Sequence, residues 1–304
     1  MGIGEPTSRV PRLAGDFSSP GELVAIIGWG QRTSRELAEE WLKRGIPAVL
    51  LSPPEAVSLL APGDTALARL DVRPTLDGIE EGLDAFAELV HRGVRVLNSR
   101  SALVHAHDKL LTAQCLVAAG IPHPKTVHLP RAGAPLGLRP PLVVKPRFGS
   151  WGIDVFRCDS DDEVEAVIRA VRDRPWFRRH GALLQELVPP TGRDIRLLVA
   201  DGRVVGGIQR VAPPGEWRTN VSLGAARRPV TPSPELNRLA IAAAAAIGGD
   251  FVGVDLLPLA DGYAVIELNG AVEFDRSYDL EGQNVYEQLA AALGVGRTTP
   301  VPGR

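Results

Sequence analysis

Short apolar runs and segments with a helical period alternate along the first hundred residues. Residues 23–27 form an apolar run, a helical period follows through Leu37 and Trp41 until Gly45, and residues 48–51 are apolar again. A strand, a glycine-containing turn, a helix and a second strand in this order predict one unit of an α/β domain.

The same alternation continues to about residue 120. Residues 65–74 are expected as a strand and a loop, residues 94–99 as a strand, and residues 76–93 between them as a helix that a glycine ends. Residues 101–119 are predicted to form one further helix, because a glycine and then a proline follow. Strands that alternate with helices predict a mainly parallel sheet.

Beyond residue 120 the pattern changes to short strands separated by proline and glycine. The segments "KTVHL", "PLVVKP" and "GIDVFRC" are predicted strands. The segment "SDDEVEAVIRAVRD" is a predicted helix with Ser160 or Asp159 as its cap and Glu163 in the position of a capping box. We therefore expect a mixed layer of strands and helices here.

Two hairpins with a helix between them are predicted in the last third of the chain. "DIRLLVADGRVVGGIQRVA" alternates apolar and polar positions around the Asp-Gly pair at 201–202, and "FVGVDLLPLADGYAVIELN" turns near the Asp-Gly pair at 261–262. The segment "SPELNRLAIAAAAAIGG" has Ser233 as a helix cap and a proline at the first helical position.

Composition limits the class of protein. The 304-residue chain is 44% apolar and 23% charged, with a net charge of -2 that gives no overall attraction to nucleic acid or anionic lipid. Its two cysteines, Cys115 and Cys158, lack metal-ligand spacing, and no apolar run reaches the roughly 18 residues of a membrane span. We expect a cytoplasmic protein without nucleic-acid or membrane partners, with a loose arm at residues 1–20 and a tail at residues 295–304.

The second hairpin carries the most informative polar residues. Glu267 and Asn269 are two apart in a strand, so their side chains share one face, and the antiparallel partner can bring Asp255 beside them. Two carboxylates and an amide oxygen suit a hard divalent cation such as Mg²⁺. A half-solvated hairpin face is the alternative, but the flanking residues are apolar, and an unpaired carboxylate is costly in a buried strand.

The stretch "KPRFGSWGIDVF" places Lys145 before Gly149 and Gly152. It is not a Walker loop, which has its lysine after the glycines and opens a helix. A loop between two strands can fold backbone N–H groups over phosphates while the strand lysine supplies charge. An ordinary glycine turn fits the pattern equally well, and a second lysine, Lys109, can join only if two domains face each other.

Two loops carry further candidates. In "GALLQELVPPTGRDIRLLV" the strand that leaves the loop can present backbone groups to an adenine edge and Asp194 to a ribose, although a simple linker explains it too. The segment "IQRVAPPGEWRTNVSLGA" holds Arg210, Arg218 and Asn220 in a polar loop. Arginines near a metal and phosphates stabilise a phosphoryl-transfer transition state, whereas a solvated loop is the alternative.

A dinucleotide site at "IIGWGQRT" is disfavoured. The segment lacks the third glycine of the fingerprint, and no acidic residue ends the second strand. The sequence also has no Gly-x-Ser-x-Gly elbow, which leaves nucleophile-triad chemistry without support.

In order, the chain contains "DKLLTAQCLVAAGIPHPKT", "VVKPRFGSWGIDV", "LLQELV", "GRDIRLLVADGRVVGGIQR", "EWRTNVSLGA", "FVGVDLL" and "VIELNGAVEF". This order and spacing resembles the ATP-grasp superfamily, specifically the RimK-like amino-acid ligases, over about residues 95–292. The "GSWG" segment and the "NxxxEF" pattern at residues 269–274 are most similar to LysX-type enzymes. The resemblance implies an ATP-grasp fold of two α+β subdomains, at residues 99–188 and 189–294, behind a smaller α/β domain at residues 21–98.

The resemblance also implies roles for individual residues. ATP phosphates would be held by Lys109 and Lys145 under a loop of Gly149, Ser150, Trp151 and Gly152, with adenine against Gln185, Glu186, Leu187 and Val188 and the ribose near Asp194. Mg²⁺, or Mn²⁺ as an alternative, would be held by Asp255, Glu267 and Asn269. The acyl phosphate and substrate carboxylates would face Arg196, Arg210, Arg218 and Asn220, with Glu273 as a candidate for the incoming amino group.

The implied activity is an ATP-dependent carboxylate–amine ligase that forms an amide through an acyl phosphate. LysX-type enzymes attach an amino acid to a glutamate of a small acidic carrier protein, and we expect an amino acid and such an acceptor as partners of a homo-oligomer, a dimer or tetramer. The proline-rich stretch "LPRAGAPLGLRPP" departs from both RimK and LysX. A glutamate ligase acting on a coenzyme, a ribosomal tail or a natural-product peptide therefore stays open, as does a nucleotide-binding protein without turnover.

Overall fold

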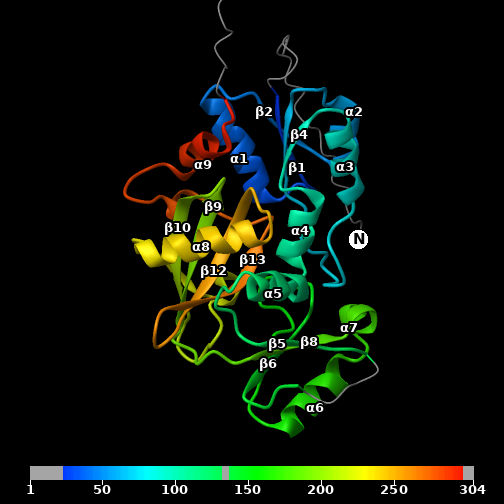
Figure 1. Ribbon diagram of the computed structural model, residues 1–304, viewed down its shortest axis with the longest axis vertical. Coiled ribbons are helices and arrows are strands. Elements are labelled where there is room, and N and C mark those ends of the chain that lie inside the picture. Colours follow the sequence, from blue (N-terminus) through cyan, green and yellow to red (C-terminus); the bar gives the residue numbers. More distant parts are fainter. Residues whose placement is uncertain (1–22, 132–136, 297–304) are drawn as a thin grey trace, which may run out of the picture.

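The structure of the protein is a computed structural model that describes residues 23–131 and 137–296. The arm expected at residues 1–20 and most of the tail expected at residues 295–304 lie outside the described residues. The described chain contains three sheets, stacked along the long axis of the molecule (Figure 1). No helix in these residues is long and apolar enough to cross a membrane.

A parallel sheet with the strand order β2-β1-β3-β4 forms the N-terminal part. The strands are β1 (Val24–Ile27), β2 (Ala48–Leu51), β3 (Thr65–Ala68) and β4 (Arg95–Leu97). Because successive strand residues face opposite sides, Val24 and Ile26 pack toward α1 (Arg32–Lys43) and α9 (Val285–Leu293). Ala25 and Ile27 pack toward α2 (Pro53–Leu59) and α3 (Leu83–His91). The predicted α/β domain with a parallel sheet is thus confirmed.

Helix α9 returns to the N-terminal sheet from the far end of the described chain. The Trp41 indole Nε1 of α1 donates a hydrogen bond of 3.0 Å to the Tyr286 carbonyl of α9. The contact is buried, so the two ends of the described chain share one core.

The second sheet is antiparallel, with the order β5-β8-β6-β7. Its elements are β5 (Thr126–Leu129), β6 (Leu142–Lys145), β7 (Phe156–Cys158), α6 (Asp161–Val171), α7 (Pro175–His180) and β8 (Ala182–Glu186). Ser160 caps α6 as predicted, since its hydroxyl accepts from the Glu163 N–H at 3.3 Å. The Glu163 carboxylate instead accepts from the Asp159 N–H, one residue before the cap.

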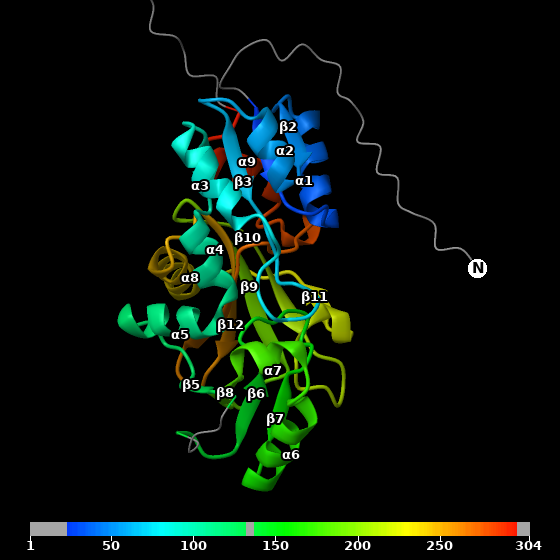
Figure 2. The same ribbon diagram turned by 90° about the vertical axis from the view of Figure 1, so that its right-hand side faces the viewer.

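The third sheet is also antiparallel, with the order β11-β10-β9-β12-β13. Its elements are β9 (Arg193–Ala200), β10 (Arg203–Val211), η1 (Val221–Leu223), β11 (Ala226–Arg228), α8 (Pro234–Ala246), β12 (Phe251–Pro258), β13 (Tyr263–Asn269) and η2 (Arg276–Tyr278). Both predicted hairpins are confirmed, and α8 begins behind Ser233 as expected. Helix α8 packs on one face of this sheet (Figure 2).

The prediction of a single helix at residues 101–119 is wrong. The structure has α4 (Arg100–His107) and α5 (Lys109–Ala118), separated at Asp108. The Asp108 carboxylate accepts from the first N–H groups of α5 and from Arg147, at 2.7 and 2.6 Å to the guanidinium. Capping and the ion pair together outweigh continuous helical bonding, and they place Lys109 at the start of α5.

The helix expected at residues 76–93 begins later, at Leu83. Leu76, Gly78 and Gly82 have positive φ angles, which an α-helix excludes, and an isolated bridge joins Val72 to Ile79. Helices α2 and α7 were not predicted, and β7 begins only at residue 156 because the preceding residues form a turn.

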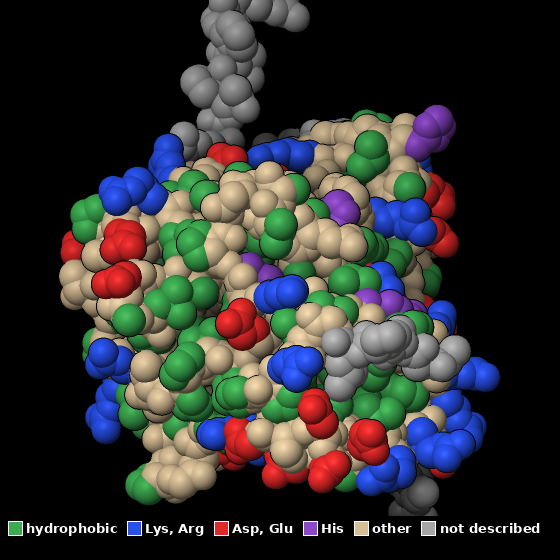
Figure 3. Space-filling model, turned by 60° about the horizontal axis from the view of Figure 1, so that its bottom comes forward, with side chains coloured by type: hydrophobic (Ala, Val, Ile, Leu, Met, Phe, Trp, Pro, Cys, Tyr) green, Lys and Arg blue, Asp and Glu red, His purple; other side chains and the backbone are tan. Residues whose placement is uncertain are grey.

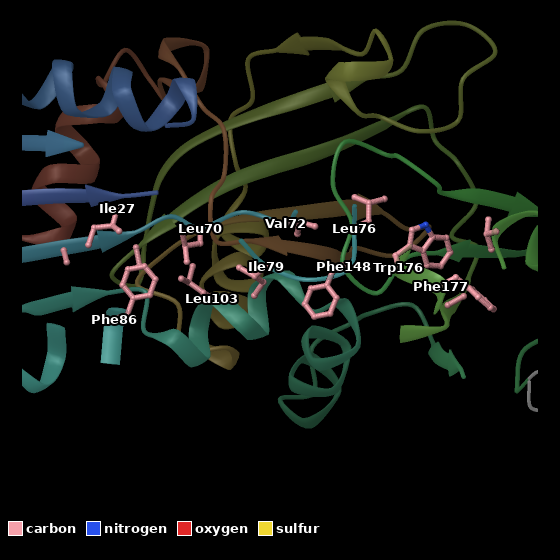
Figure 4. Close-up of a cluster of buried hydrophobic side chains, with 14 of the residues drawn as sticks. Ile27, Leu70, Val72, Leu76, Ile79, Phe86, Leu103, Phe148, Trp176 and Phe177 are labelled. Carbon is pink, nitrogen blue, oxygen red and sulfur yellow. The ribbon is translucent and has the colours of Figure 1, made fainter. Parts of the chain in front are cut away.

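The segment at residues 70–80 connects the N-terminal sheet to the second sheet. Figure 4 follows one row of buried side chains from Ile27 of β1 through Leu76 and Ile79 to Trp176 and Phe177 of α7. The His180 Nε2 atom lies 3.0 Å from the Asp77 carbonyl at the far end of the segment. One continuous core thus crosses from one sheet to the other.

On the face drawn in Figure 3, acidic and basic side chains are interspersed.

Candidate active site

Two adjoining cavities contain the predicted site residues. The first cavity lies between the second and third sheets and has about 1010 Å³ of space, including the part open to solvent. The predicted residues that line it are Lys109, Lys145, Gly149, Ser150, Gly152, Gln185, Glu186, Leu187, Val188, Asp194, Arg210, Arg218, Asn220, Asp255 and Glu267. Basic, acidic and apolar side chains all contribute to this lining.

The second cavity adjoins the first and also contacts the N-terminal part. The predicted residues that line it are Ser150, Trp151, Arg196, Arg210, Asn220, Glu267, Asn269 and Glu273. Four of these, Ser150, Arg210, Asn220 and Glu267, line both cavities and form the wall between them. The structure thus brings every predicted site residue to one of two adjacent cavities.

Lys109 reaches the wall from the start of α5. Its Nζ atom lies 2.9 Å from Glu267 Oε1 and donates to the Gly149 carbonyl at 2.6 Å. The break at Asp108 makes this possible, because it aims the first turn of α5 at the loop after β6. Lys109 is therefore joined to both the glycine loop and the β12–β13 hairpin.

Lys145 ends β6 in a buried position. Its Nζ atom donates to Gln185 Oε1 at 2.7 Å, and Gln185 in turn donates to the Thr126 hydroxyl at 2.8 Å. Burial and the nearby charge of Lys109 lower the pKa of Lys145 to about 7. The predicted adenine contact of Gln185 remains a prediction, because its side chain is turned toward Lys145 in this structure.

The β12–β13 hairpin places Asp255 directly opposite Glu267, with Asn269 two residues farther along β13. Arg196 binds both oxygens of Asp255, at 2.6 and 2.7 Å, and Arg210 binds one at 2.8 Å. Burial alone would raise the pKa of Asp255, but the charges of Arg196 and Arg210 hold it well below its usual range. Asp255 is therefore a carboxylate at neutral pH.

The donor set of this hairpin fits an oxygen-bound divalent cation. Asp255, Glu267 and Asn269 each supply a side-chain oxygen, and Glu267 Oε1 is held by Lys109. The buried Nδ2 atom of Asn269, which lacks a partner among the described residues, is a donor and does not bind the cation itself. Carboxylate oxygens have further lone pairs, so Asp255 and Glu267 can bind a cation and keep these contacts. No group of three His, Cys, Asp or Glu side chains within the described ranges is arranged to hold a metal. Phosphate oxygens and water would have to complete the coordination.

Arg210 is fixed between two carboxylates. Its guanidinium binds Asp194 through both Nε, at 2.7 Å, and Nη2, and the Thr219 hydroxyl donates to Asp194 at 2.6 Å. The carboxylate of Asp194 thus already has two side-chain partners. Its contact to a ribose remains a prediction.

The loop that contains Gly149 to Gly152 is joined to the loop after β10. Arg218 donates to the Gly152 carbonyl at 3.2 Å, and the Ser222 hydroxyl donates to the Trp151 carbonyl at 2.8 Å. Gly152 has a φ angle of 73°, and a Cβ atom there would lie 2.7 Å from Asn220 Oδ1, so a larger residue would be strained at this position. Trp151 itself is 47% exposed at the rim of the second cavity.

Four residues with ionisable side chains line the second cavity and were not predicted. They are Asp71, His107, Arg227 and Tyr278. Asp71 follows β3, at the carboxyl edge of a parallel sheet, where ligands of α/β proteins bind, and this position was the available signal. The other three carried no local signal, because they lie on unrelated elements.

Comparison with protein families gives one match that spans most of the chain. A model described as the RimK-like ATP-grasp domain matches residues 106–293. The matched range contains most of both cavities, including the glycine loop and the β12–β13 hairpin.

Individual proteins agree with this match. A glutamate–LysW ligase of Sulfurisphaera tokodaii is 32% identical over 75% of this chain and 83% of its own length. An α-aminoadipate–LysW ligase of Saccharolobus solfataricus is 33% identical over 65% of this chain and 73% of its own. The crystal structure of a RimK domain ATP-grasp protein from Sphaerobacter thermophilus superposes with a TM-score of 0.63, at 22% identity, over 89% of this chain and 99% of that one.

Proposed function

This chain belongs to the RimK-like ATP-grasp family, and we propose that it joins an amino acid to a glutamate carboxylate of a carrier protein or peptide at the expense of ATP. The two relatives named above support this choice of substrates, because both are named for joining an amino acid to LysW. A homo-oligomer, a dimer or tetramer, remains a prediction.

The shared wall is the observation that carries the proposal. Arg210 and Glu267 line both cavities, so a phosphoryl donor in the first cavity meets a carboxylate in the second across these residues. In the proposed reaction an acceptor carboxylate oxygen takes the γ-phosphoryl group with release of ADP. The amine nitrogen then forms the amide bond, phosphate leaves the acyl carbon, and the amine loses a proton.

The residues of the two cavities fit these two steps. Lys109 and Lys145 would bind phosphate oxygens. The negative charge of the phosphates would raise the pKa of Lys145, which burial lowers, and so keep its ammonium group protonated. Arg210 would stabilise the acyl phosphate, since its two carboxylate partners fix its donors before the reaction begins. Asp255, Glu267 and Asn269 would hold Mg²⁺, or alternatively Mn²⁺, which supplies charge stabilisation to phosphoryl oxygens when bound.

The test is a product analysis with the full chain. Mg-ATP, a glutamate-terminated acidic peptide and a panel of amino acids are combined, and ADP and the peptide mass are followed. We expect ADP release that needs both organic substrates and a peptide heavier by one amino acid less one water.

Two outcomes would reject the proposed acceptor. ADP release that leaves the peptide unmodified, together with product formation when a coenzyme or another carboxylate replaces the peptide, would favour the alternative ligases. ATP binding without ADP release from any pair would favour a nucleotide-binding protein without turnover. Glu267→Gln serves as the inactive control, and Glu39→Gln, an exposed change on α1, as the matched active one.

A further inference from the structure

The segment between α5 and β5 joins the second sheet to the third. Strand β13 lies at the edge of the third sheet, and this segment is bonded to it at Val265. The Val265 N–H donates to the Pro122 carbonyl at 2.9 Å, and the Val265 carbonyl lies 2.8 Å from His123 Nδ1. Glu267 follows two residues later in the same strand. The chain that leads into the second sheet is therefore anchored beside the β12–β13 hairpin.

His123 is a neutral imidazole with a defined tautomer. A carbonyl oxygen can only accept a hydrogen bond, so Nδ1 carries the hydrogen and donates it to Val265. Burial lowers the pKa of His123 to about 4 against the opposing effect of this carbonyl, and the charge of Lys145 also lowers it. At neutral pH the Nε2 atom therefore has a lone pair and is an acceptor.

This acceptor and the Thr126 hydroxyl determine the orientation of the Gln185 amide. Gln185 Nε2 lies 2.8 Å from Thr126 Oγ1 and 3.3 Å from His123 Nε2. The Thr126 hydroxyl donates its hydrogen to the Pro124 carbonyl at 2.9 Å, which leaves its lone pairs to accept from Gln185. Two acceptors thus face one side of the amide, and only the NH₂ group can satisfy both. The amide oxygen has to point the other way.

Lys145 lies on that other side of the Gln185 amide. Gln185 Oε1 accepts from Lys145 Nζ at 2.7 Å, and this is the one hydrogen bond of the ammonium group within the described residues. Lys145 and Gln185 are only 6% and 3% exposed, so the bond is shielded from water. A turned amide would aim its NH₂ group at the ammonium and its oxygen at the lone pair of His123, and both contacts are repulsive. A directed chain of hydrogen bonds thus runs from the β13 backbone to Lys145.

His123 and Thr126 are not among the residues that line the two cavities, whereas Lys145 lines the first. We propose that His123 and Thr126 are positioning residues, which orient the Gln185 amide and through it hold the Lys145 ammonium group at a fixed place beside the β12–β13 hairpin. The inference rests on the proposed function in one respect, namely that Lys145 binds a phosphate oxygen of ATP.

The test compares the binding of Mg-ATP with that of adenosine, which has no phosphate, to the full chain. Thr126→Val keeps nearly the same side-chain shape and removes one acceptor of the Gln185 amide. We expect the Kd for Mg-ATP to rise about fivefold, the equivalent of roughly 1 kcal/mol for one hydrogen bond, and the Kd for adenosine to stay unchanged. Competition against a fluorescent ATP analogue measures both ligands. A merely structural role would weaken both ligands alike.

Three further variants serve as controls. Thr126→Ser keeps the hydroxyl and should bind Mg-ATP as the unchanged protein does. His123→Asn keeps a donor for the Val265 carbonyl but removes the acceptor, so it should reproduce the pattern of Thr126→Val. Thr231→Val, at an exposed threonine that lines neither cavity, should leave both Kd values unchanged.

The titration of Lys145 reports its position without any ligand. The chain contains four lysines, at positions 43, 109, 125 and 145, so NMR of lysine-labelled protein can follow each one, and Lys145→Met identifies its signal. We expect the pKa of Lys145, about 7 in the unchanged protein, to fall in Thr126→Val, because an ammonium group that loses its acceptor is less stable. The charges of Lys109 and Glu267, which also act on Lys145, are the same in the variants compared.

The outcomes separate this inference from the proposed function. An unchanged Kd for Mg-ATP together with an unchanged titration of Lys145 in Thr126→Val would overturn the inference, as would equal weakening of Mg-ATP and adenosine. A lowered pKa of Lys145 with unchanged binding of Mg-ATP would keep the positioning of Lys145 and reject its contact with phosphate, which belongs to the proposed function.

Discussion

The two cavities differ in how far their charged groups are paired. In the first cavity the charged side chains bind one another or protein amides: Lys145 binds Gln185, and Arg210 binds Asp194 and Asp255. In the second cavity Asp71 and Glu273 form no ion pair with lysine or arginine among the described residues, although the charges of Arg227, Arg196 and Arg69 act on Glu273. The charged groups of the first cavity are therefore held in ion pairs or by amides, whereas the second cavity combines paired arginines with two carboxylates that form no ion pair with lysine or arginine in the described ranges.

This difference distinguishes residues that contribute to stability from residues that contribute to ligand recognition. Removing one member of a buried ion pair leaves a charge that neither water nor protein compensates. Removing a carboxylate that repels its neighbour relieves a cost, and stability gained in this way at a functional site is accompanied by a loss of function. Mutations in the two cavities should therefore have different effects on unfolding.

The largest effect on stability is expected from Arg210→Met. It leaves Asp194 and Asp255 buried with fewer partners, so the free energy of unfolding should fall by about 3–5 kcal/mol. The matched change in the second cavity, Arg227→Met, breaks a half-exposed pair and should cost less than about 1 kcal/mol. Urea unfolding of both variants measures the difference, and equal losses would contradict the comparison.

Glu267→Gln tests the wall shared by the cavities. The change keeps the shape of the side chain but removes its charge, and Lys109 loses its ion pair. We expect turnover to fall by about two to three orders of magnitude, the scale of losing one preorganised electrostatic group. Initial rates of ADP release check this, with circular dichroism as a control for folding. Activity near the wild-type level would remove Glu267 from the site.

Lys145 should make the stability of the ligand-free protein depend on pH. Its pKa falls from 10.5 to about 7 on folding, so between these values the unfolded chain binds more protons, and stability should rise with pH. The slope is at most about 1.4 kcal/mol per pH unit for one proton. Unfolding curves from pH 7 to 10 measure it, and Lys145→Met should flatten the profile. An identical slope in this variant would mean that another group titrates.

The smallest effect is expected from Trp151→Ala. Trp151 lines the second cavity and not the first, and it is half-exposed. We expect the KM for the acceptor peptide to rise about fivefold, corresponding to roughly 1 kcal/mol of lost aromatic contact, with the KM for ATP unchanged. A change in the KM for ATP alone would place Trp151 with the nucleotide instead.

Much of the fold and of the first cavity could be predicted from local patterns. The period-2 alternation and the two Asp-Gly turns predict both hairpins, and a hairpin brings Asp255 opposite Glu267 by its register alone. The helix break at Asp108 could not be predicted in this way, because the ion pair with Arg147 that supports it spans 39 residues. Short-range propensity favours a continuous helix there, and the tertiary contact overrides it.

The sequence by itself determined most of the strands, the hairpin with its carboxylates and the glycine loop with its lysine, because neighbours in the chain impose these features. Only the tertiary structure decided that Asp71 of the N-terminal sheet and Glu273 of the C-terminal loop share one cavity. Arg69 joins the elements that carry them, because its guanidinium donates to the Val272 carbonyl across 203 residues. No periodic pattern encodes a contact of that range, since it arises from packing three sheets into one molecule.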